Sequence, residues 1–137
     1  TRRDILTELP FGNGTVKLQI TGAQVLQMLE HGLSVGDTGG GRFPQISGFT
    51  VVWDPKAEIG TRVVEVAVGG QPLDPGKTYT LATNDFLARG GDGYLVFAGL
   101  PRLIDPDGAQ LMAGQVMAYV TAQGQVAPKV EGRITAK

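Results

Sequence analysis

The sequence contains no cysteine and only one histidine, His31. The missing cysteines exclude structural disulfides, thiolate nucleophiles and zinc knuckles. A single histidine also excludes a metal site built from several histidines within this chain. We therefore expect no metal ligands here, and we expect His31 to have a surface or packing role.

Blocks of like charge and long apolar runs are also absent. The formal net charge is −1 without a basic stripe, whereas contacts to a nucleic-acid backbone need clustered lysine and arginine. No apolar run approaches the roughly 20 residues of a membrane span. We therefore expect neither a nucleic-acid polymer as partner nor a membrane span. The chain opens on Thr1 without a signal-peptide pattern, and we interpret this start as a cut inside a larger protein.

Glycine and proline are abundant, with 21 and 8 residues, and hydrophobic residues make up 42% of the chain. The glycines and prolines separate patterned segments instead of forming a low-complexity run. A chain of 137 residues suits one compact domain with a real core. The composition therefore predicts one α+β domain over residues 1–137, in which strands outnumber helices.

Periodicity predicts the main elements. Apolar and polar residues alternate over 15–20, which indicates a half-buried strand. Thr21 and Gln24 form a capping-box signal that opens a helix over about 22–33. The other expected elements are a helix end over 1–8 stopped by Pro10, a glycine-rich loop over 34–44, strands near 46–53, 62–68, 71–73, 78–83 and 130–135, and a helix over about 108–122.

Two of these expectations are specific enough to be tested residue by residue. On the strand at 62–68 we expect Val64, Val66 and Val68 to share one face, before a tight turn at Gly69-Gly70. For the late helix we expect the Asp105-Pro106-Asp107 segment to form its start.

The segment from Thr83 to Tyr94 is the most informative for function. It presents Phe86 and then surrounds Asp92 with three glycines. Glycines permit positive φ angles and let a ligand approach the main chain closely. An aspartate in such a turn suits a vicinal diol such as ribose, and a phenylalanine ring suits a nucleobase. From the spacing alone, an ordinary Asp-Gly turn and a core phenylalanine remain the commoner explanation.

Several motifs resemble those of the 5′-nucleotidase C-terminal domain. The segment from Phe86 to Tyr94, FLARGGDGY, resembles the family signature NFLANGGDGF/Y, and Leu9 to Asn13 is similar to the family's LPFGN. The resemblance covers almost the whole chain and implies an α+β fold with a mixed β-sheet and flanking helices. Further matches follow in the family's order: TGAQ at 21–24, LEH at 29–31, GRFPQISG at 41–48, WDP at 53–55, PLDP at 72–75, KTY at 77–79 and VEGRI at 130–134.

Carried over to these positions, the resemblance implies a nucleoside-binding site. Phe11 and Phe86 would sandwich the base, and Asp92 would accept hydrogen bonds from the ribose hydroxyls. Asn13 would meet the edge of the base, and Gly41 would let the glycine-rich loop close over it. Stacking between aromatic rings tolerates any base, so this arrangement predicts affinity with broad base specificity.

One family feature has no match. A Gly-Gly-Gly-Ile-Arg segment, whose arginine contacts the substrate phosphates, precedes the LPFGN motif in the family. The resemblance therefore implies a domain truncated at its N-terminal edge, which holds the nucleoside end of a substrate better than the phosphate end. None of Arg2, Arg3, Arg42 and Arg89 matches the missing arginine.

By resemblance, the parent protein is a two-domain phosphoesterase that hydrolyses nucleotides to nucleosides and phosphate. Two divalent metal ions in a covalently linked N-terminal domain would activate the attacking water, and hinge motion would deliver the substrate. The chain itself would be the inactive substrate-binding half. The family also implies a periplasmic, secreted or cell-surface location.

Other functions remain open from the sequence. The parent could be a UDP-sugar hydrolase, a 2′,3′-cyclic-nucleotide phosphodiesterase or a thiosulfate-ester hydrolase. The two phenylalanines, Phe11 and Phe86, favour a substrate that contains a base over the sulfur ester. A non-catalytic module that binds nucleosides, glycans or a protein is the alternative from another class.

Overall fold

The structure is a computed structural model that describes residues 1–36 and 40–137. Part of the predicted glycine-rich loop, residues 37–39, therefore lies outside the described residues. The helices are α1 (Arg2–Glu8), α2 (Gly22–Leu33), α3 (Asp85–Ala88) and α4 (Met112–Gln123). The strands are β1 (Gly14–Thr21), β2 (Phe49–Trp53), β3 (Val63–Val68), β4 (Gln71–Pro72), β5 (Thr78–Asn84), β6 (Arg102–Ile104), β7 (Gln110–Leu111) and β8 (Ile134–Ala136).

The strands of the described residues form two four-stranded sheets. In the first sheet, β1 lies between β5 on one side and β6 and β7 on the other, and every pairing is antiparallel. In the second sheet the order is β4-β3-β2-β8, and β8 runs parallel to β2. The predicted α+β class is therefore confirmed, and the second of the two sheets is mixed.

The early strand and helix form where the sequence predicts them. Val16, Leu18 and Ile20 of β1 are fully buried or nearly so, whereas the side chains between them point to solvent. Thr21 Oγ1 accepts a hydrogen bond from the Gln24 amide at 3.3 Å, and Gln24 Oε1 accepts one from the Thr21 amide at 2.9 Å. This reciprocal capping satisfies free amides at the start of α2.

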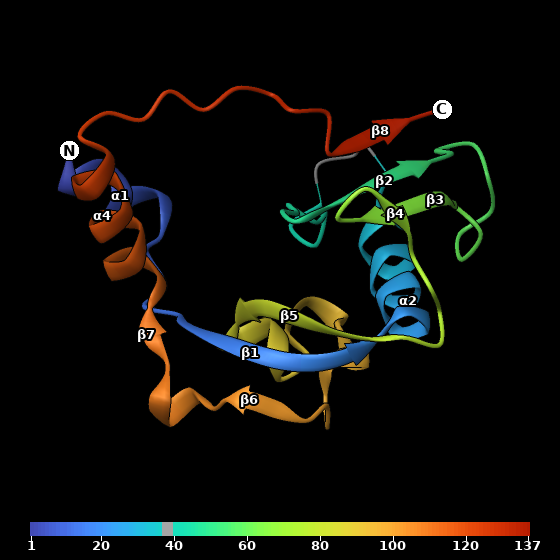
Figure 1. Ribbon diagram of the computed structural model, residues 1–137, viewed down its shortest axis with the longest axis horizontal. Helices are drawn as coiled ribbons and strands as arrows, with labels where there is room; N and C mark the ends of the chain where they lie inside the picture. Colours follow the sequence, from blue (N-terminus) through green and yellow to red (C-terminus); the bar gives the residue numbers. More distant parts are fainter. Residues whose placement is uncertain (37–39) are drawn as a thin grey trace.

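Helix α2 contacts both β1 and β3, so it connects the two sheets (Figure 1). Its last turn is held by side chains as well as by packing. Glu30 accepts hydrogen bonds from the amides of Arg62 and Val63, at 2.9 and 2.7 Å. In return, Arg62 Nη1 donates to the carbonyls of Leu33 and Ser34 at 2.8 and 3.1 Å. The end of α2 is therefore tied to the start of β3.

We expect Arg62→Met to lower the free energy of unfolding by about 2 kcal/mol, because a charged donor of several hydrogen bonds is lost while the carbonyls stay partly buried. Chemical denaturation measures this change. Arg102→Met is the matched control, since Arg102 makes no side-chain hydrogen bond within the described part of the chain. The control should change stability by less than about 0.5 kcal/mol. Equal losses in the two variants would contradict the role of Arg62.

The predicted face of β3 is wrong for Val64, which is 50% exposed. The pairing with β2 shifts here, because Val52 lies opposite Glu65 while Trp53 lies opposite Val63. Val64 is the extra residue of this β-bulge, and a bulge breaks the alternation of faces. The predicted Gly69-Gly70 turn is confirmed, with φ angles of 58° and 78° that favour glycine.

The predicted start of the late helix is also wrong, because α4 begins only at Met112. Residues Pro106–Gly108 form a single 3-10 turn, and the next residues pair with β1 as strand β7. The Met112 amide then donates to the Asn13 carbonyl at 2.9 Å. These contacts with a distant strand hold the backbone extended and delay the helix. Helix α4 has no buried residue and lies beside α1 (Figure 1).

Candidate functional site

All five residues singled out in the sequence line one cavity of about 1350 Å³. They come from four separate parts of the fold. Phe11 and Asn13 precede β1, Gly41 lies between α2 and β2, Phe86 belongs to α3, and Asp92 lies in the 3-10 turn that follows. The fold therefore brings these distant residues to a common space.

Both phenylalanine rings are accessible from solvent. Phe11 is 85% exposed and Phe86 is 44% exposed, so neither ring is part of the core. Helix α3 is a single turn, and the Asn84 side chain caps it by accepting from the Leu87 amide at 2.7 Å. A Cβ added to Gly91 would lie 2.5 Å from the Phe86 ring. The position of this ring therefore depends on glycine at 91.

Asn13 is held in place by an aspartate that the sequence analysis missed. Its Nδ2 donates to Asp85 Oδ1 at 3.1 Å, and the same oxygen accepts from the Gly14 amide at 3.1 Å. Arg89 Nη1 lies 2.9 Å from the other carboxylate oxygen. The Asn13 hydrogen bond, together with Arg89, lowers the pKa of Asp85 against the opposing effect of burial. Asn13 keeps its carbonyl oxygen and one N–H available for a ligand.

Asp92 has an unusual backbone conformation. Its φ of 52° is the only positive φ of a non-glycine residue in the described ranges. Gly90 and Gly93 on either side also have positive φ angles, of 91° and 82°. The Asp92 carbonyl accepts a hydrogen bond from His31 Nε2 at 2.9 Å. His31 thus has a contact to the loop that the sequence did not predict.

Tyr94 joins the two loops that border the cavity. It is buried, stacks on Phe97 with ring centroids 5.4 Å apart, and donates its hydroxyl proton to the Arg42 carbonyl at 2.5 Å. Burial, and then the charge of Asp92, raises the pKa of Tyr94 to about 12. Tyr94 therefore stays protonated at neutral pH and keeps this hydrogen bond.

The charged lining of the cavity consists of Asp92 and three arginines, Arg42, Arg89 and Arg133. Arg89 pairs with Asp85, and Arg133 lies 3.5 Å from Glu131. Arg42 has no carboxylate partner among the described residues, and its buried Nε has no hydrogen-bond partner there. The cavity is therefore suited to a ligand with an anionic group.

Gly41 is exposed and lines the cavity, and a Cβ there would meet nothing within 4 Å. Its predicted role in loop closure stays a prediction. Sequence reasoning missed Asp85, His31 and Arg42. The sequence offered one indication that Asp85 belongs to the site, because Asp85 immediately precedes Phe86. The contact of Asp85 with Asn13, however, joins segments that are far apart in the chain.

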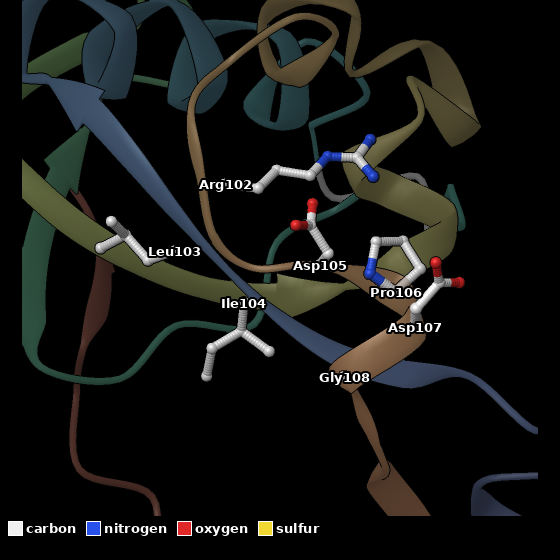
Figure 2. A pocket seen from close by; sticks show the side chains of 7 residues that line it. All are labelled: Arg102, Leu103, Ile104, Asp105, Pro106, Asp107 and Gly108. Atoms are coloured by element: carbon white, nitrogen blue, oxygen red, sulfur yellow. The ribbon is translucent and has the colours of Figure 1, made fainter.

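A second hollow, of about 790 Å³, is less suited to a specific ligand. Figure 2 shows its lining, Arg102 to Gly108, which is one continuous stretch of chain from β6 to the 3-10 turn and contains no aromatic side chain. Over residues 1–36 and 40–137, no three potential metal-binding side chains come together. In the same ranges, no helix is long and apolar enough to cross a membrane.

Comparisons with known proteins agree with one another. The family described as "5'-nucleotidase, C-terminal domain" matches residues 1–99. The trifunctional nucleotide phosphoesterase protein YfkN of Bacillus subtilis is 34% identical over 98% of this chain and 9% of its own length. A snake venom 5'-nucleotidase of Gloydius brevicauda is 35% identical over 98% of this chain and 24% of its own length. The chain thus spans a quarter or less of these relatives.

Solved structures give the same result. The 5'-nucleotidase precursor from Thermus thermophilus matches with a TM-score of 0.90 and 35% identity, over 99% of this chain and 27% of that one. The NAD nucleotidase NadN of Haemophilus influenzae matches with a TM-score of 0.82 and 25% identity, over the whole of this chain and 26% of that one.

Proposed function

Because the chain belongs to the 5′-nucleotidase family and forms its C-terminal domain, we propose that it binds the nucleoside part of a nucleotide. The base lies between Phe11 and Phe86, and the carboxylate of Asp92 accepts hydrogen bonds from the ribose hydroxyls. Asn13 meets the base edge, and the loop at Gly41 closes the site. The observation that carries the proposal is the common cavity lined by all five residues.

The exposure of the two rings supports this role. A phenylalanine that served only the core would be buried, whereas Phe11 is almost wholly exposed on the cavity wall. Exposed aromatic rings gain by stacking on a base, by roughly 1–3 kcal/mol per base in single-strand binders. Arg42, the lining arginine without a carboxylate partner among the described residues, favours a ligand with phosphate, such as a nucleotide, over a neutral sugar.

Hydrolysis belongs to the parent protein in this proposal. The described residues offer no metal-binding cluster, so the two divalent metal ions would be held by an N-terminal domain covalently linked to this one. The parent would release phosphate from nucleotides, whereas the 137-residue chain alone would not. The venom relatives favour a secreted, periplasmic or cell-surface protein. Phosphate release and cell fractionation of the full-length protein test these two points.

Calorimetric titration of the chain with adenosine and with glucose tests the binding proposal. We expect saturable binding of adenosine, none of glucose, and a loss of about tenfold or more in adenosine affinity in Phe86→Ala. Binding of glucose in preference to adenosine would instead support a glycan-binding module. Unchanged adenosine binding in Phe86→Ala would contradict the stacking role of this ring.

A further inference from the structure

The conformation of Asp92 requires support from the surrounding structure. With φ at 52° and ψ at 21°, its backbone lies in the left-handed region, which is unfavourable for a residue with a side chain. Aspartate tolerates this region better than most residues. The turn is also short, with glycine on both sides. A contact from outside the turn would therefore help to hold the Asp92 backbone, from which the carboxylate projects.

His31 supplies that contact. Its Nε2 lies 2.9 Å from the Asp92 carbonyl oxygen, and because a carbonyl only accepts, Nε2 must carry the proton. The imidazole also packs edge-on against Tyr94, with ring centroids 4.8 Å apart at 77°. A Cβ added to Gly93 would lie 2.8 Å from His31 Cε1. The loop therefore approaches the histidine as closely as glycine permits.

The histidine projects from a fixed part of the fold. It lies in the last turn of α2, one residue after Glu30, which binds two amides at the start of β3. Arg62 binds the carbonyl of Leu33 at the end of the same turn. The hydrogen bond to Asp92 therefore connects a short glycine-rich turn to a helix held at its end by two side chains.

From these contacts we infer that His31 is a positioning residue for Asp92 and thereby sets the preference of the site for a ribose diol. It does not line the cavity, so it acts through the backbone of Asp92 and touches no ligand. The inference rests on the proposed nucleoside site. It predicts that loss of the Nε2 donor weakens the recognition of sugar hydroxyls and leaves stacking on the base unchanged.

Two variants of His31 separate its hydrogen bond from its packing. His31→Phe keeps an aromatic ring against Tyr94 and removes the donor. His31→Gln removes the ring and returns an N–H at a similar reach. The ligands are adenosine and 2′,3′-dideoxyadenosine, which share the base and differ in the ribose hydroxyls, and the full 137-residue chain is titrated by calorimetry. Asp92→Asn defines the contribution of the carboxylate to the preference.

We expect the wild-type chain to prefer adenosine, and Asp92→Asn to remove most of this preference. His31→Phe should lower the ratio of adenosine affinity to dideoxyadenosine affinity about fivefold, as expected for the loss of one hydrogen bond. The affinity for dideoxyadenosine itself should stay unchanged. His31→Gln should keep the ratio within about twofold of wild type. Thermal melting of each variant checks that the domain is folded.

The outcomes distinguish the inference from the proposed function. If His31→Phe kept the wild-type ratio of adenosine to dideoxyadenosine affinity, the positioning role of His31 would be overturned and the proposed nucleoside site would stand. Equal weakening of both ligands in His31→Phe would also overturn the positioning role, because general distortion does not select for hydroxyls. A wild-type chain that does not prefer adenosine, or whose preference survives in Asp92→Asn, would overturn the proposed diol contact and this inference together.

Discussion

Replacing Gly22 with alanine is expected to lower the free energy of unfolding by at least about 3 kcal/mol. Gly22 is the first residue of α2, and a Cβ there would lie 2.1 Å from the Asp74 carbonyl oxygen and 2.9 Å from Pro75 Cα. Both atoms belong to the backbone, so no side-chain rotation relieves the overlap. The Gly22 amide also donates to the Lys77 carbonyl at 3.0 Å, and separating the segments would break this bond.

The matched control for this change is Gly114→Ala in α4. The added Cβ would be 4.0 Å from Leu111 Cβ, which is an ordinary contact, and the site is exposed in the first turn of the helix. Alanine is favoured over glycine there by roughly 0.5–1 kcal/mol. The same chemical change should therefore have opposite signs at the two positions. Chemical denaturation measures both, and a stable Gly22→Ala protein would show that the turn at 74–77 can move away from α2.

The second large effect concerns the two rings of the cavity. We expect the double variant Phe11→Ala/Phe86→Ala to lose at least about 30-fold in adenosine affinity, because each ring should contribute about 1–3 kcal/mol by stacking. The free energy of unfolding should fall by less than about 1 kcal/mol, since both side chains are exposed. Calorimetry and chemical denaturation, done on the same preparations, measure the two quantities.

The control for the double variant is Val130→Ala, which shortens an apolar side chain that is fully exposed and lies outside the cavity lining. It should change neither adenosine affinity nor stability measurably. If each single ring variant abolished binding as completely as the double, the rings would act as one unit, as expected for a slot that closes on the base from both sides. If the double variant kept full affinity, the base would bind elsewhere.

Much of the fold could be predicted because its signals are local. The alternation around Leu18, the capping box at Thr21 and Gln24, and the turn at Gly69-Gly70 each depend on a few neighbouring residues. The same holds for the choice of Phe11, Asn13, Gly41, Phe86 and Asp92, which came from short motifs with a known order. Their assembly around one cavity required the whole fold.

The errors have a common cause. Val64 was assigned to the wrong face because a bulge opposite Trp53 shifts the register between two strands. The helix was started too early because residues Gln110–Leu111 pair with β1 instead. In both cases the deciding hydrogen bonds join backbone groups from distant parts of the chain, and a local pattern contains no information about them.

By itself, the sequence determined where most of the strands, helices and turns lie, and which side chains are chemically able to hold a base and a diol. Tertiary structure alone decided that Asp85 holds Asn13 and that His31 holds the backbone of Asp92. The physical reason is that propensity and periodicity act over a turn or a few residues, whereas a hydrogen bond depends on distance and direction in space. This distance and this direction become defined only when α2, β1 and the turn after α3 have packed together.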